Sequence, residues 1–249
     1  MAATALSALF SLEGQTALVT GGTRGIGQAV CLALAEAGAD LILIQRSREN
    51  LETQKAVEAL GRKAPIYTAD LASQEEVAGI TSTILKDGHS IHILVNCAGI
   101  QRRHPSHEFP DKDWNEVIQV NLNTVFTLCR DVGAHMLKLE PSAITGRRGS
   151  IINFASLLTF QGGLTVPAYS ASKGAVGQLT KALSNEWASK GINVNAIAPE
   201  RLRSISERIP AGRWGSPDDF KASVVFLASK GSAYISGDIL TVDGGWMGR

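Results

Sequence analysis

Short apolar runs alternate with longer stretches of helical periodicity along most of this chain of 249 residues. The first run, at 15–20, stops at two glycines, and residues 26–38 then place apolar side chains three and four positions apart. Further apolar runs, each expected to form a strand, lie at 41–44, 64–67, 91–95, 150–154, 192–197 and 239–242. They show little polar alternation, which is typical of parallel strands buried on both faces. The pattern therefore predicts an α/β fold with a doubly wound, seven-stranded parallel sheet and helices on both faces.

Stretches of helical periodicity separate the expected strands. After 26–38, the expected helices are 51–60, 73–85, 114–139 and a helix that carries Tyr169 and ends at residue 190. Ser216 should start a further helix, because this serine cap is followed by a proline in the first turn and by Asp219 three residues after the cap. Strands and helices alternate without a linker or an internal repeat, so we expect one domain.

Composition and charge narrow the classes of function. With 44% hydrophobic residues, the single domain 1–249 can build one substantial core, and its N-terminal extension, 1–12, lacks the basic start and cleavage pattern of a secretion signal. A net charge of +1 gives no electrostatic basis for binding nucleic acid, and no apolar run reaches about 18 residues, the length that spans a bilayer. We therefore expect a cytoplasmic protein that acts on a small molecule, without a nucleic-acid or membrane partner.

The cysteine and histidine patterns argue against a disulfide framework and against a metal site. Cys31, Cys97 and Cys129 are odd in number and widely spaced, which favours thiols in a reducing compartment. His104 and His107 lie three residues apart, but no nearby residue supplies the further ligands of a closed zinc site. We therefore expect no bound metal.

A glycine-rich turn follows the first expected strand. Gly21, Gly25 and Gly27 stand where a backbone must turn tightly, approach a pyrophosphate and let the next helix pack against the sheet. Their spacing is G-x-x-x-G-x-G, which differs from the commonest dinucleotide fingerprint, G-x-G-x-x-G. Glycines also serve plain turns, but a cluster between a strand and a helix indicates a nucleotide site.

The end of the second strand bears on which nicotinamide cofactor would bind there. An acid at this point would accept hydrogen bonds from the ribose hydroxyls and repel a 2′-phosphate, but the chain reads Ile44-Gln45-Arg46-Ser47. Arg46 and Arg24 could clamp a phosphate through charge-assisted hydrogen bonds. We therefore favour NADP(H), with NAD(H) as the alternative because a glutamine can serve NAD. Asp70, after the third strand, is expected either to accept a hydrogen bond from an adenine amino group or to cap the next helix.

Tyr169 and Lys173 are the strongest indication of chemistry in the chain. A helix brings positions four residues apart onto one face, so the phenol and the ammonium would lie side by side. The positive charge then favours the phenolate and makes the tyrosine a better proton donor and acceptor near neutral pH. Such pairs are usually surface neighbours, but Ser156 at the end of a strand, Asn96 after the fourth strand and Asn121 favour a catalytic interpretation.

These residues resemble the short-chain dehydrogenase/reductase family, which has a Rossmann fold. The likeness rests on the TGxxxGIG turn and on Asn121, Ser156, Tyr169 and Lys173, and it extends over almost the whole chain. It implies that Tyr169 exchanges a proton with the substrate oxygen, that Ser156 orients this oxygen, and that Lys173 promotes ionisation of the tyrosine and binds the nicotinamide ribose. Asn121 would hold a water that links Lys173 to solvent. The expected cofactor-binding residues are Gly21, Thr23, Arg24, Gly25, Ile26, Gly27, Arg46, Asp70, Leu71, Asn96, Ala98, Gly99, Tyr169, Lys173 and Pro199.

Within that family, the likeness is greatest to 2-deoxy-D-gluconate 3-dehydrogenases and 2-dehydro-3-deoxy-D-gluconate 5-dehydrogenases. Segments 10–14, 154–163, 185–187, 208–215 and 243–246 carry it. The resemblance implies an NAD(P)(H)-dependent oxidoreductase that interconverts a secondary alcohol and a ketone on a deoxy or keto sugar acid. A reductase of 3-oxoacyl or polyketide-like carbonyls is an alternative, and so is a non-catalytic nucleotide-binding sensor or scaffold. The resemblance also implies a homotetramer, because small residues along the Tyr169 helix, among them Gly177, allow helices to approach closely.

Substrate contacts are expected from loops at the same edge of the sheet. Arg102 and Arg103 follow the fourth strand, where a guanidinium could bind a carboxylate through a two-point contact, although solvated loop arginines fit the pattern equally well. Gln161 could bind a substrate hydroxyl or only support its loop. Together with Ser156 and Tyr169, these three residues are the expected substrate-binding set.

Two positions depart from the pattern of the family. Cys97 replaces the second asparagine of the NNAG strand end, a mild change because Asn96 and Gly99 remain. After Pro199, the usual segment that covers the substrate is shorter by about a dozen residues or more, so 199–215 corresponds to a truncated or partly missing lid. Either the protein lacks this cover or the sequence as it stands omits part of it, and we favour the second.

Overall fold

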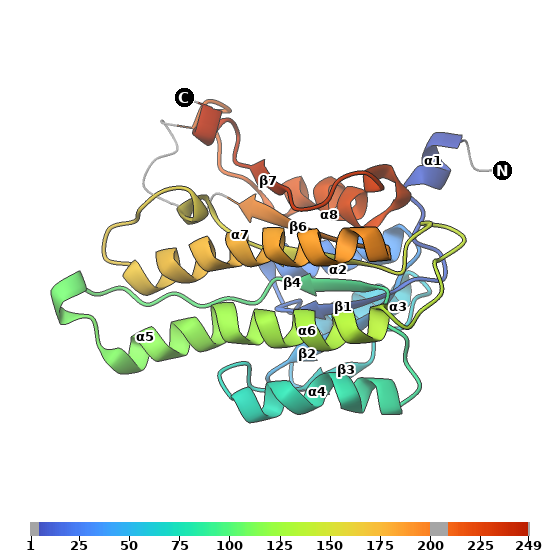
Figure 1. Ribbon diagram of the computed structural model, residues 1–249, viewed down its shortest axis with the longest axis horizontal. Coiled ribbons are helices and arrows are strands. Elements are labelled where there is room, and N and C mark those ends of the chain that lie inside the picture. Colours follow the sequence, from blue (N-terminus) through green and yellow to red (C-terminus); the bar gives the residue numbers. More distant parts are fainter. Residues whose placement is uncertain (1–4, 200–208, 249) are drawn as a thin grey trace.

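Seven parallel strands form one sheet in the order β3-β2-β1-β4-β5-β6-β7 in this computed structural model, which describes residues 5–199 and 209–248 (Figure 1). The strands are β1 (Thr16–Thr20), β2 (Asp40–Gln45), β3 (Ile66–Thr68), β4 (Ile93–Asn96), β5 (Gly149–Phe154), β6 (Ile192–Pro199) and β7 (Ile239–Val242). Each strand begins and ends within two residues of its predicted bounds. The predicted doubly wound parallel sheet is confirmed.

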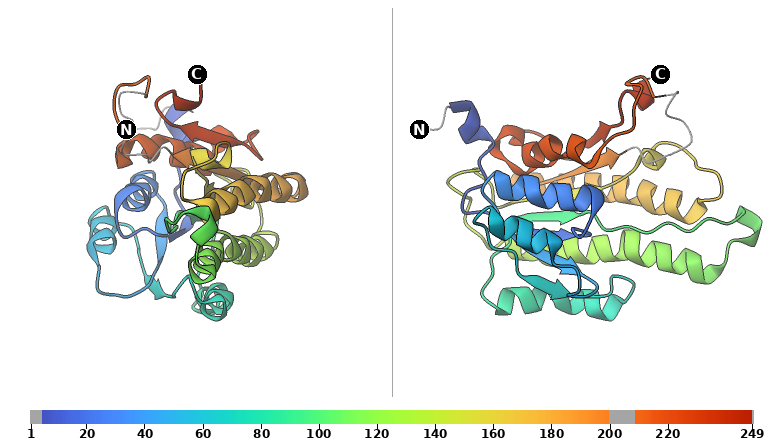
Figure 2. Two further views of the ribbon diagram at one scale, coloured as in Figure 1. Left: turned by 90° about the vertical axis from the view of Figure 1, so that its left-hand side faces the viewer. Right: turned by 180° about the vertical axis from the view of Figure 1, so that it is seen from behind.

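Helices cover both faces of this sheet, as the two opposite views in Figures 1 and 2 show. One layer contains α2 (Gly25–Glu36), α3 (Glu52–Ala59) and α8 (Lys221–Ala228), and the other contains α4 (Gln74–Lys86), α5 (Asp111–Ile118), α6 (Thr124–Met136) and α7 (Pro167–Trp187). The short helix α1 (Ala5–Leu9) precedes β1 and has no buried residues. Short 3-10 turns lie at Ser106–Glu108, Leu157–Thr159, Ala188–Lys190, Pro217–Phe220, Lys230–Ser232 and Trp246–Gly248. The predicted cap at Ser216 is present, and it starts the 3-10 turn that leads into α8.

The two helical layers follow from the alternation of side chains along each strand. On β1, Ala17 and Val19 join a buried cluster with α2 and α8, whereas Leu18 between them joins a second cluster with α4, α6 and α7. All residues of β5 and β6 are buried. Because both faces of the sheet are covered, the side chains of these central strands are buried on both sides, and most of them are apolar.

The long helix predicted at 114–139 is interrupted in the structure. A π-helical turn, Gln119–Asn123, joins α5 to α6, so the rod is continuous but one turn is wider than an α-helical turn. The residues on either side keep ordinary right-handed helical φ and ψ angles, and hydrophobic periodicity therefore gives no sign of the change. The turn carries Asn121, which is completely buried.

The strand order reverses between β1 and β4, and open parallel sheets bind ligands at such a point, outside the carboxyl ends of the strands. Buried amides reinforce this edge. Asn96 at the end of β4 donates to Asn153 on β5 at 3.0 Å, and Asn153 donates to Thr180 on α7 at 3.0 Å. Asn96 is only 1% exposed, and its bond to Asn153 holds β5 and, through Asn153, α7 in place.

Some features are missing from the part of the chain that the structure describes. Within residues 5–199 and 209–248, no helix is both long enough and apolar enough to cross a membrane. The same described residues contain no group of three or more His, Cys, Asp or Glu side chains that could hold a metal ion. The shortened cover expected after Pro199 falls largely at 200–208, which lies outside the described residues.

Candidate active site

Tyr169 and Lys173 lie one turn apart near the start of α7. The helix begins at Pro167, a residue suited to a first helical turn. Lys173 is only 4% exposed, and its Nζ donates a hydrogen bond of 2.6 Å to the carbonyl of Phe154 at the end of β5. The same Nζ lies 5.7 Å from the centroid of the Tyr169 ring. The structure thus places the phenol and the ammonium side by side, as their spacing in the sequence predicts.

Ser156 follows β5 and caps the 3-10 turn Leu157–Thr159. Its Oγ accepts a hydrogen bond from the backbone N–H of Leu158 at 3.2 Å. This bond uses a lone pair of the hydroxyl and leaves its proton available for a substrate oxygen. Ser156 is 8% exposed, so such an oxygen would meet it in a largely desolvated place.

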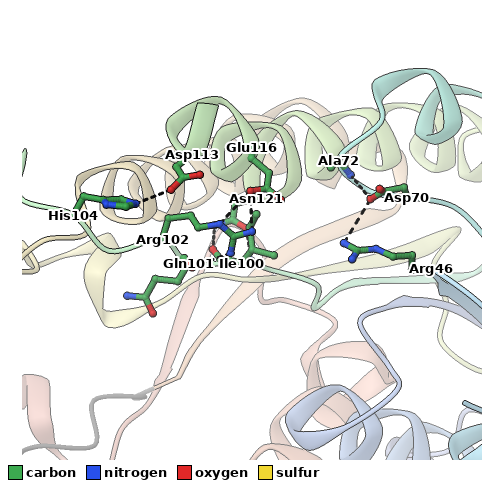
Figure 3. Close-up of polar contacts among 10 residues, drawn as sticks. All are labelled: Arg46, Asp70, Ala72, Ile100, Gln101, Arg102, His104, Asp113, Glu116 and Asn121. Atoms are coloured by element: carbon green, nitrogen blue, oxygen red, sulfur yellow. Dashed lines mark hydrogen bonds and ion pairs between the residues drawn. The ribbon is translucent and has the colours of Figure 1, made fainter. Parts of the chain in front are cut away.

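Asn121 joins the loop after β4 to α7. Its Nδ2 donates to the carbonyl of Ile100 at 2.9 Å, and its Oδ1 accepts from the N–H of Ile100 at 2.9 Å (Figure 3). The same Nδ2 donates to Ser172 Oγ on α7 at 3.1 Å. Gly99 is held close by this arrangement: a Cβ added there would lie 3.4 Å from Asn121 Oδ1 and 3.6 Å from Lys173 Nζ. Asn121 therefore fixes the backbone beside Lys173. The water that the family resemblance assigns to Asn121 stays a prediction.

A cleft opens where these side chains meet. Ser156, Tyr169, Lys173 and Arg103 line it together with mostly apolar and small residues from α2, from the ends of β5 and β6, and from the loops after β4 and β5. The other lining residues are Ile26, Cys97, Gly99, Ile100, Gln101, Phe154, Ala155, Leu157, Leu158 and Pro199. Among the described residues that line the cleft, Arg103 and Lys173 are the only charged ones, which makes the cleft electropositive.

The glycine-rich turn adjoins this cleft and can only be built from glycines at two of its positions. Gly21 has a φ of 71°, and a Cβ there would lie 2.8 Å from backbone atoms of Ala98. A Cβ on Gly27 would lie 2.0 Å from the carbonyl oxygen of Gly21. Gly25, with a φ of 57°, has open space where its side chain would be, and it starts α2. The unpaired N–H groups of this helix start and the open space above it fit a pyrophosphate.

Arg46 and Asp70 come together beyond the turn, after β2 and β3. Their side chains are 74% and 42% exposed, and Arg46 Nη2 lies 3.7 Å from Asp70 Oδ1 (Figure 3). Asp70 Oδ1 also accepts from the N–H of Ala72 at 3.0 Å, so this carboxylate supports the turn before α4. The Gln45 amide donates to the carbonyls of Ser47 and Asn50, at 2.8 and 3.0 Å, and shapes the loop after β2.

Arg102 and Arg103 have different surroundings although they are neighbours. Arg102 donates to Glu116 Oε2 on α5, through Nε at 3.1 Å and through Nη2 at 2.8 Å (Figure 3). It is not one of the described residues that line the cleft. Arg103 does line the cleft, and its Nη1 lies 3.5 Å from the carbonyl of Leu164. Only the second arginine therefore shares a space with the candidate catalytic groups.

The sequence indicated a substrate contact for Gln161 and not for Gln101, but of the two only Gln101 lines the cleft that the described residues form. Gln161 Oε1 accepts a hydrogen bond of 3.1 Å from Trp246 Nε1, which ties the loop after β5 to the last 3-10 turn, and Gln161 lies outside the lining of the cleft that the described residues form. Gln101 lines the cleft but was missed by the sequence analysis. The available signal was its position in the loop after β4, immediately before Arg102 and Arg103.

Comparison with known proteins agrees with the fold and with the residues gathered at this edge. The profile of the short chain dehydrogenase family matches residues 15–206. The 2-dehydro-3-deoxy-D-gluconate 5-dehydrogenase of Pseudoalteromonas atlantica is 50% identical over 257 residues, which cover 96% of this chain and 98% of that protein. The corresponding enzyme of Bacillus subtilis is 47% identical over 255 residues, which cover 96% and 97%. Because both matches are longer than the 249 residues of this chain, these relatives have residues that it lacks.

A solved structure is similar over the same extent. The crystal structure of a gluconate 5-dehydrogenase from Burkholderia cenocepacia in complex with NADP and tartrate has a TM-score of 0.89 and 35% sequence identity. The match covers 98% of this chain and 99% of that one. The resemblance inferred from the sequence motifs is therefore confirmed.

We predict that a thiol reagent labels the native chain once, at Cys97. Cys31 and Cys129 are completely buried, and burial raises the pKa of both thiols, that of Cys129 to about 12, so both stay protonated and shielded. Cys97 is half-buried and lines the cleft. Mass spectrometry after brief labelling should show one adduct, and the denatured chain, with its three cysteines, is the control. An adduct on Cys31 in the native chain would contradict the packing described here.

Proposed function

Because this chain belongs to the short-chain dehydrogenase/reductase family, and is thus an NAD(P)-dependent oxidoreductase that acts on CH–OH groups, we propose a sugar-acid substrate and a preference for NADP(H). The substrate would be a deoxy or keto sugar acid such as 2-deoxy-D-gluconate or 2-dehydro-3-deoxy-D-gluconate. One observation carries the proposal: Ser156, Tyr169 and Lys173 line a cleft in which the charged residues, among those that the structure describes, are all cationic. A substrate that brings its own carboxylate complements such a cleft. The sugar-acid relatives described above support the same class.

The proposed chemistry divides between the cofactor and the chain. When bound, the nicotinamide cofactor supplies or accepts the hydride. Tyr169 exchanges the proton with the substrate oxygen, and the hydroxyl of Ser156 donates a hydrogen bond to the same oxygen. Lys173, held by the carbonyl of Phe154, keeps a positive charge beside the phenol and favours its ionised form. Asn121 contributes by fixing the backbone at Ile100 and Gly99.

The residues around the glycine-rich turn fit a dinucleotide. The turn and the start of α2 would bind the pyrophosphate, because the space beside Gly25 is open, and because glycines at 21 and 27 let the backbone of the turn pack more tightly than a Cβ would allow. Arg24 and Arg46 would bind the 2′-phosphate, and Asp70 the adenine. The remaining proposed cofactor contacts are Thr23, Gly25, Ile26, Leu71, Asn96, Ala98, Gly99, Tyr169, Lys173 and Pro199.

The homotetramer expected from the resemblance is part of the proposal, but Gly177 does not support it as a subunit contact. Gly177 does not face outward: a Cβ on it would lie 2.6 Å from Thr159 Cγ2 and 3.1 Å from Ile239 Cδ1 of the same chain. Trp114 and Phe126, on α5 and α6, are better candidates for a subunit contact, because these large apolar side chains are 38% and 45% exposed.

The proposal is tested by turnover of keto sugar acids, 3-oxoacyl thioesters and neutral ketones, each assayed with NADPH and with NADH. We expect the highest kcat/KM with a keto sugar acid and NADPH. The Tyr169→Phe variant is the control: it should lose turnover while its affinity for NADPH stays close to that of the wild type, because only the proton-transferring hydroxyl is removed. Binding of cofactor without turnover of any carbonyl would instead favour a sensor, and a preference for thioesters would favour the alternative reductase.

We expect Arg46→Ala to weaken the binding of NADPH about 10- to 100-fold and to leave the binding of NADH nearly unchanged, since a hydrogen bond to a charged group contributes about 1.5–3 kcal/mol. The exposed contact between Arg46 and Asp70 is weak enough for a phosphate to replace it. Dissociation constants from cofactor fluorescence would measure the effect. Arg48→Ala is the matched control, because Arg48 already donates to the carbonyl of Ile66 at 3.0 Å. Equal losses for both cofactors in Arg46→Ala would refute the assignment.

Arg103→Ala should raise the KM for a keto sugar acid about 10- to 100-fold, because it removes a charge-assisted hydrogen bond to the carboxylate. The kcat and the kinetics with a neutral ketone should change little, because Arg103 would bind the carboxylate and would take no part in proton or hydride transfer. Steady-state kinetics on both substrates would separate these effects. Arg130→Ala, which removes an exposed arginine paired with Asp131, is the control for net charge. An unchanged KM for the sugar acid would exclude Arg103 as the carboxylate partner.

A further inference from the structure

The hydroxyl of Thr159 joins the backbones of two members of the candidate catalytic set. Thr159 Oγ1 donates a hydrogen bond of 2.9 Å to the carbonyl of Lys173 and accepts one of 3.3 Å from the N–H of Ser156. Thr159 is the last residue of the 3-10 turn that Ser156 caps, so the contact to α7 is made by the turn itself. One oxygen atom therefore links the serine segment to the lysine segment.

The packing around this threonine shows that the contact is built into α7. The methyl group of Thr159 lies where a side chain at position 177 of the helix would be, because a Cβ on Gly177 would approach Thr159 Cγ2 to 2.6 Å. The same added Cβ would also lie 3.1 Å from Ile239 Cδ1 of β7, so two side chains already fill the space beside Gly177. Glycine at this helical position lets the 3-10 turn come close enough for the hydroxyl to reach the Lys173 carbonyl.

The same contact completes a ring of hydrogen bonds around the end of β5. Lys173 Nζ donates to the Phe154 carbonyl, two residues before Ser156, and Thr159 connects the Lys173 backbone to the N–H of Ser156. The Leu158 N–H donates to Ser156 Oγ inside this ring. The position of Ser156 relative to α7 is thus fixed from both sides, through the lysine ammonium and through the threonine hydroxyl.

We propose that Thr159 is a positioning residue that holds the Ser156 hydroxyl at its working distance from Tyr169 and Lys173. Thr159 is not among the described residues that line the cleft, so it acts through Ser156 and Lys173 and does not touch the substrate. The proposal rests on the proposed function, because it assigns a role within the same reaction. Loss of the hydroxyl leaves the Ser156 N–H without its partner and lets the turn shift, and a shift of about 1 Å in a reacting group can cost about 100-fold in rate.

The test uses two variants that separate the hydroxyl from the methyl group. Thr159→Val keeps the packing against Gly177 and removes both hydrogen bonds, whereas Thr159→Ser keeps the hydroxyl and removes the methyl contact. For Thr159→Val we expect a kcat about 100-fold lower, with the KM and the dissociation constant for NADPH within about threefold of the wild type. Thr159→Ser should keep kcat within about threefold of the wild type even if its melting temperature falls.

A control variant and four outcomes decide between the proposal and its alternatives. Thr83→Val removes a hydroxyl that donates to the Gly79 carbonyl at 3.1 Å on α4, outside the cleft, and should leave kcat unchanged. An active wild type with equally active Thr159→Val would overturn the proposal, and so would a loss in Thr159→Ser as large as in Thr159→Val. A fall in kcat that comes with an equal loss of NADPH binding would show a merely structural role and would also overturn it. A wild type without carbonyl turnover would refute the proposed function itself, and the role of Thr159 with it.

Discussion

The buried ammonium of Lys173 needs a hydrogen-bond partner, and the carbonyl that supplies it joins α7 to β5. At 4% exposure the charge has lost most of its hydration, which is costly unless another polar group replaces the water. The Phe154 carbonyl does so at 2.6 Å. Because Ser156 lies two residues after Phe154 and Tyr169 lies one turn before Lys173, this bond brings together the two hydroxyls that would flank a substrate oxygen.

Neutral amides build the frame around this bond, so the frame does not cancel the positive charge of the cleft. Asn96 and Asn153 connect β4, β5 and α7, and Asn121 holds the loop after β4 against α7. Glu116 on α5 pairs with Arg102, and neither is among the described residues that line the cleft. The field of Lys173 and Arg103 therefore remains available for an anionic ligand.

The sequence predicted the strands, most of the helices and several residues of the candidate site, but not all of the contacts that these residues make. Apolar periodicity placed all seven strands, and the four-residue spacing placed Tyr169 and Lys173 on one side of α7. Charge alone could not distinguish Arg102 from Arg103, because the difference lies in a glutamate that α5 brings to one of them. The π-helical turn at Gln119–Asn123 also escaped prediction, since its flanking residues have ordinary helical angles and its Asn121 bonds to the loop after β4, which is distant in the sequence.

Local patterns along the chain determined the order of strands and helices, the glycine-rich turn and the pairing of Tyr169 with Lys173, because each depends on residues only a few positions apart. The tertiary structure decided which polar groups meet across greater separations. Thr159 reaches the Lys173 backbone only because Gly177 leaves space for it, and Gln161 pairs with Trp246 across most of the C-terminal third of the chain. Such contacts depend on how close two elements pack, and packing distance is a property of the folded core rather than of any short stretch of sequence.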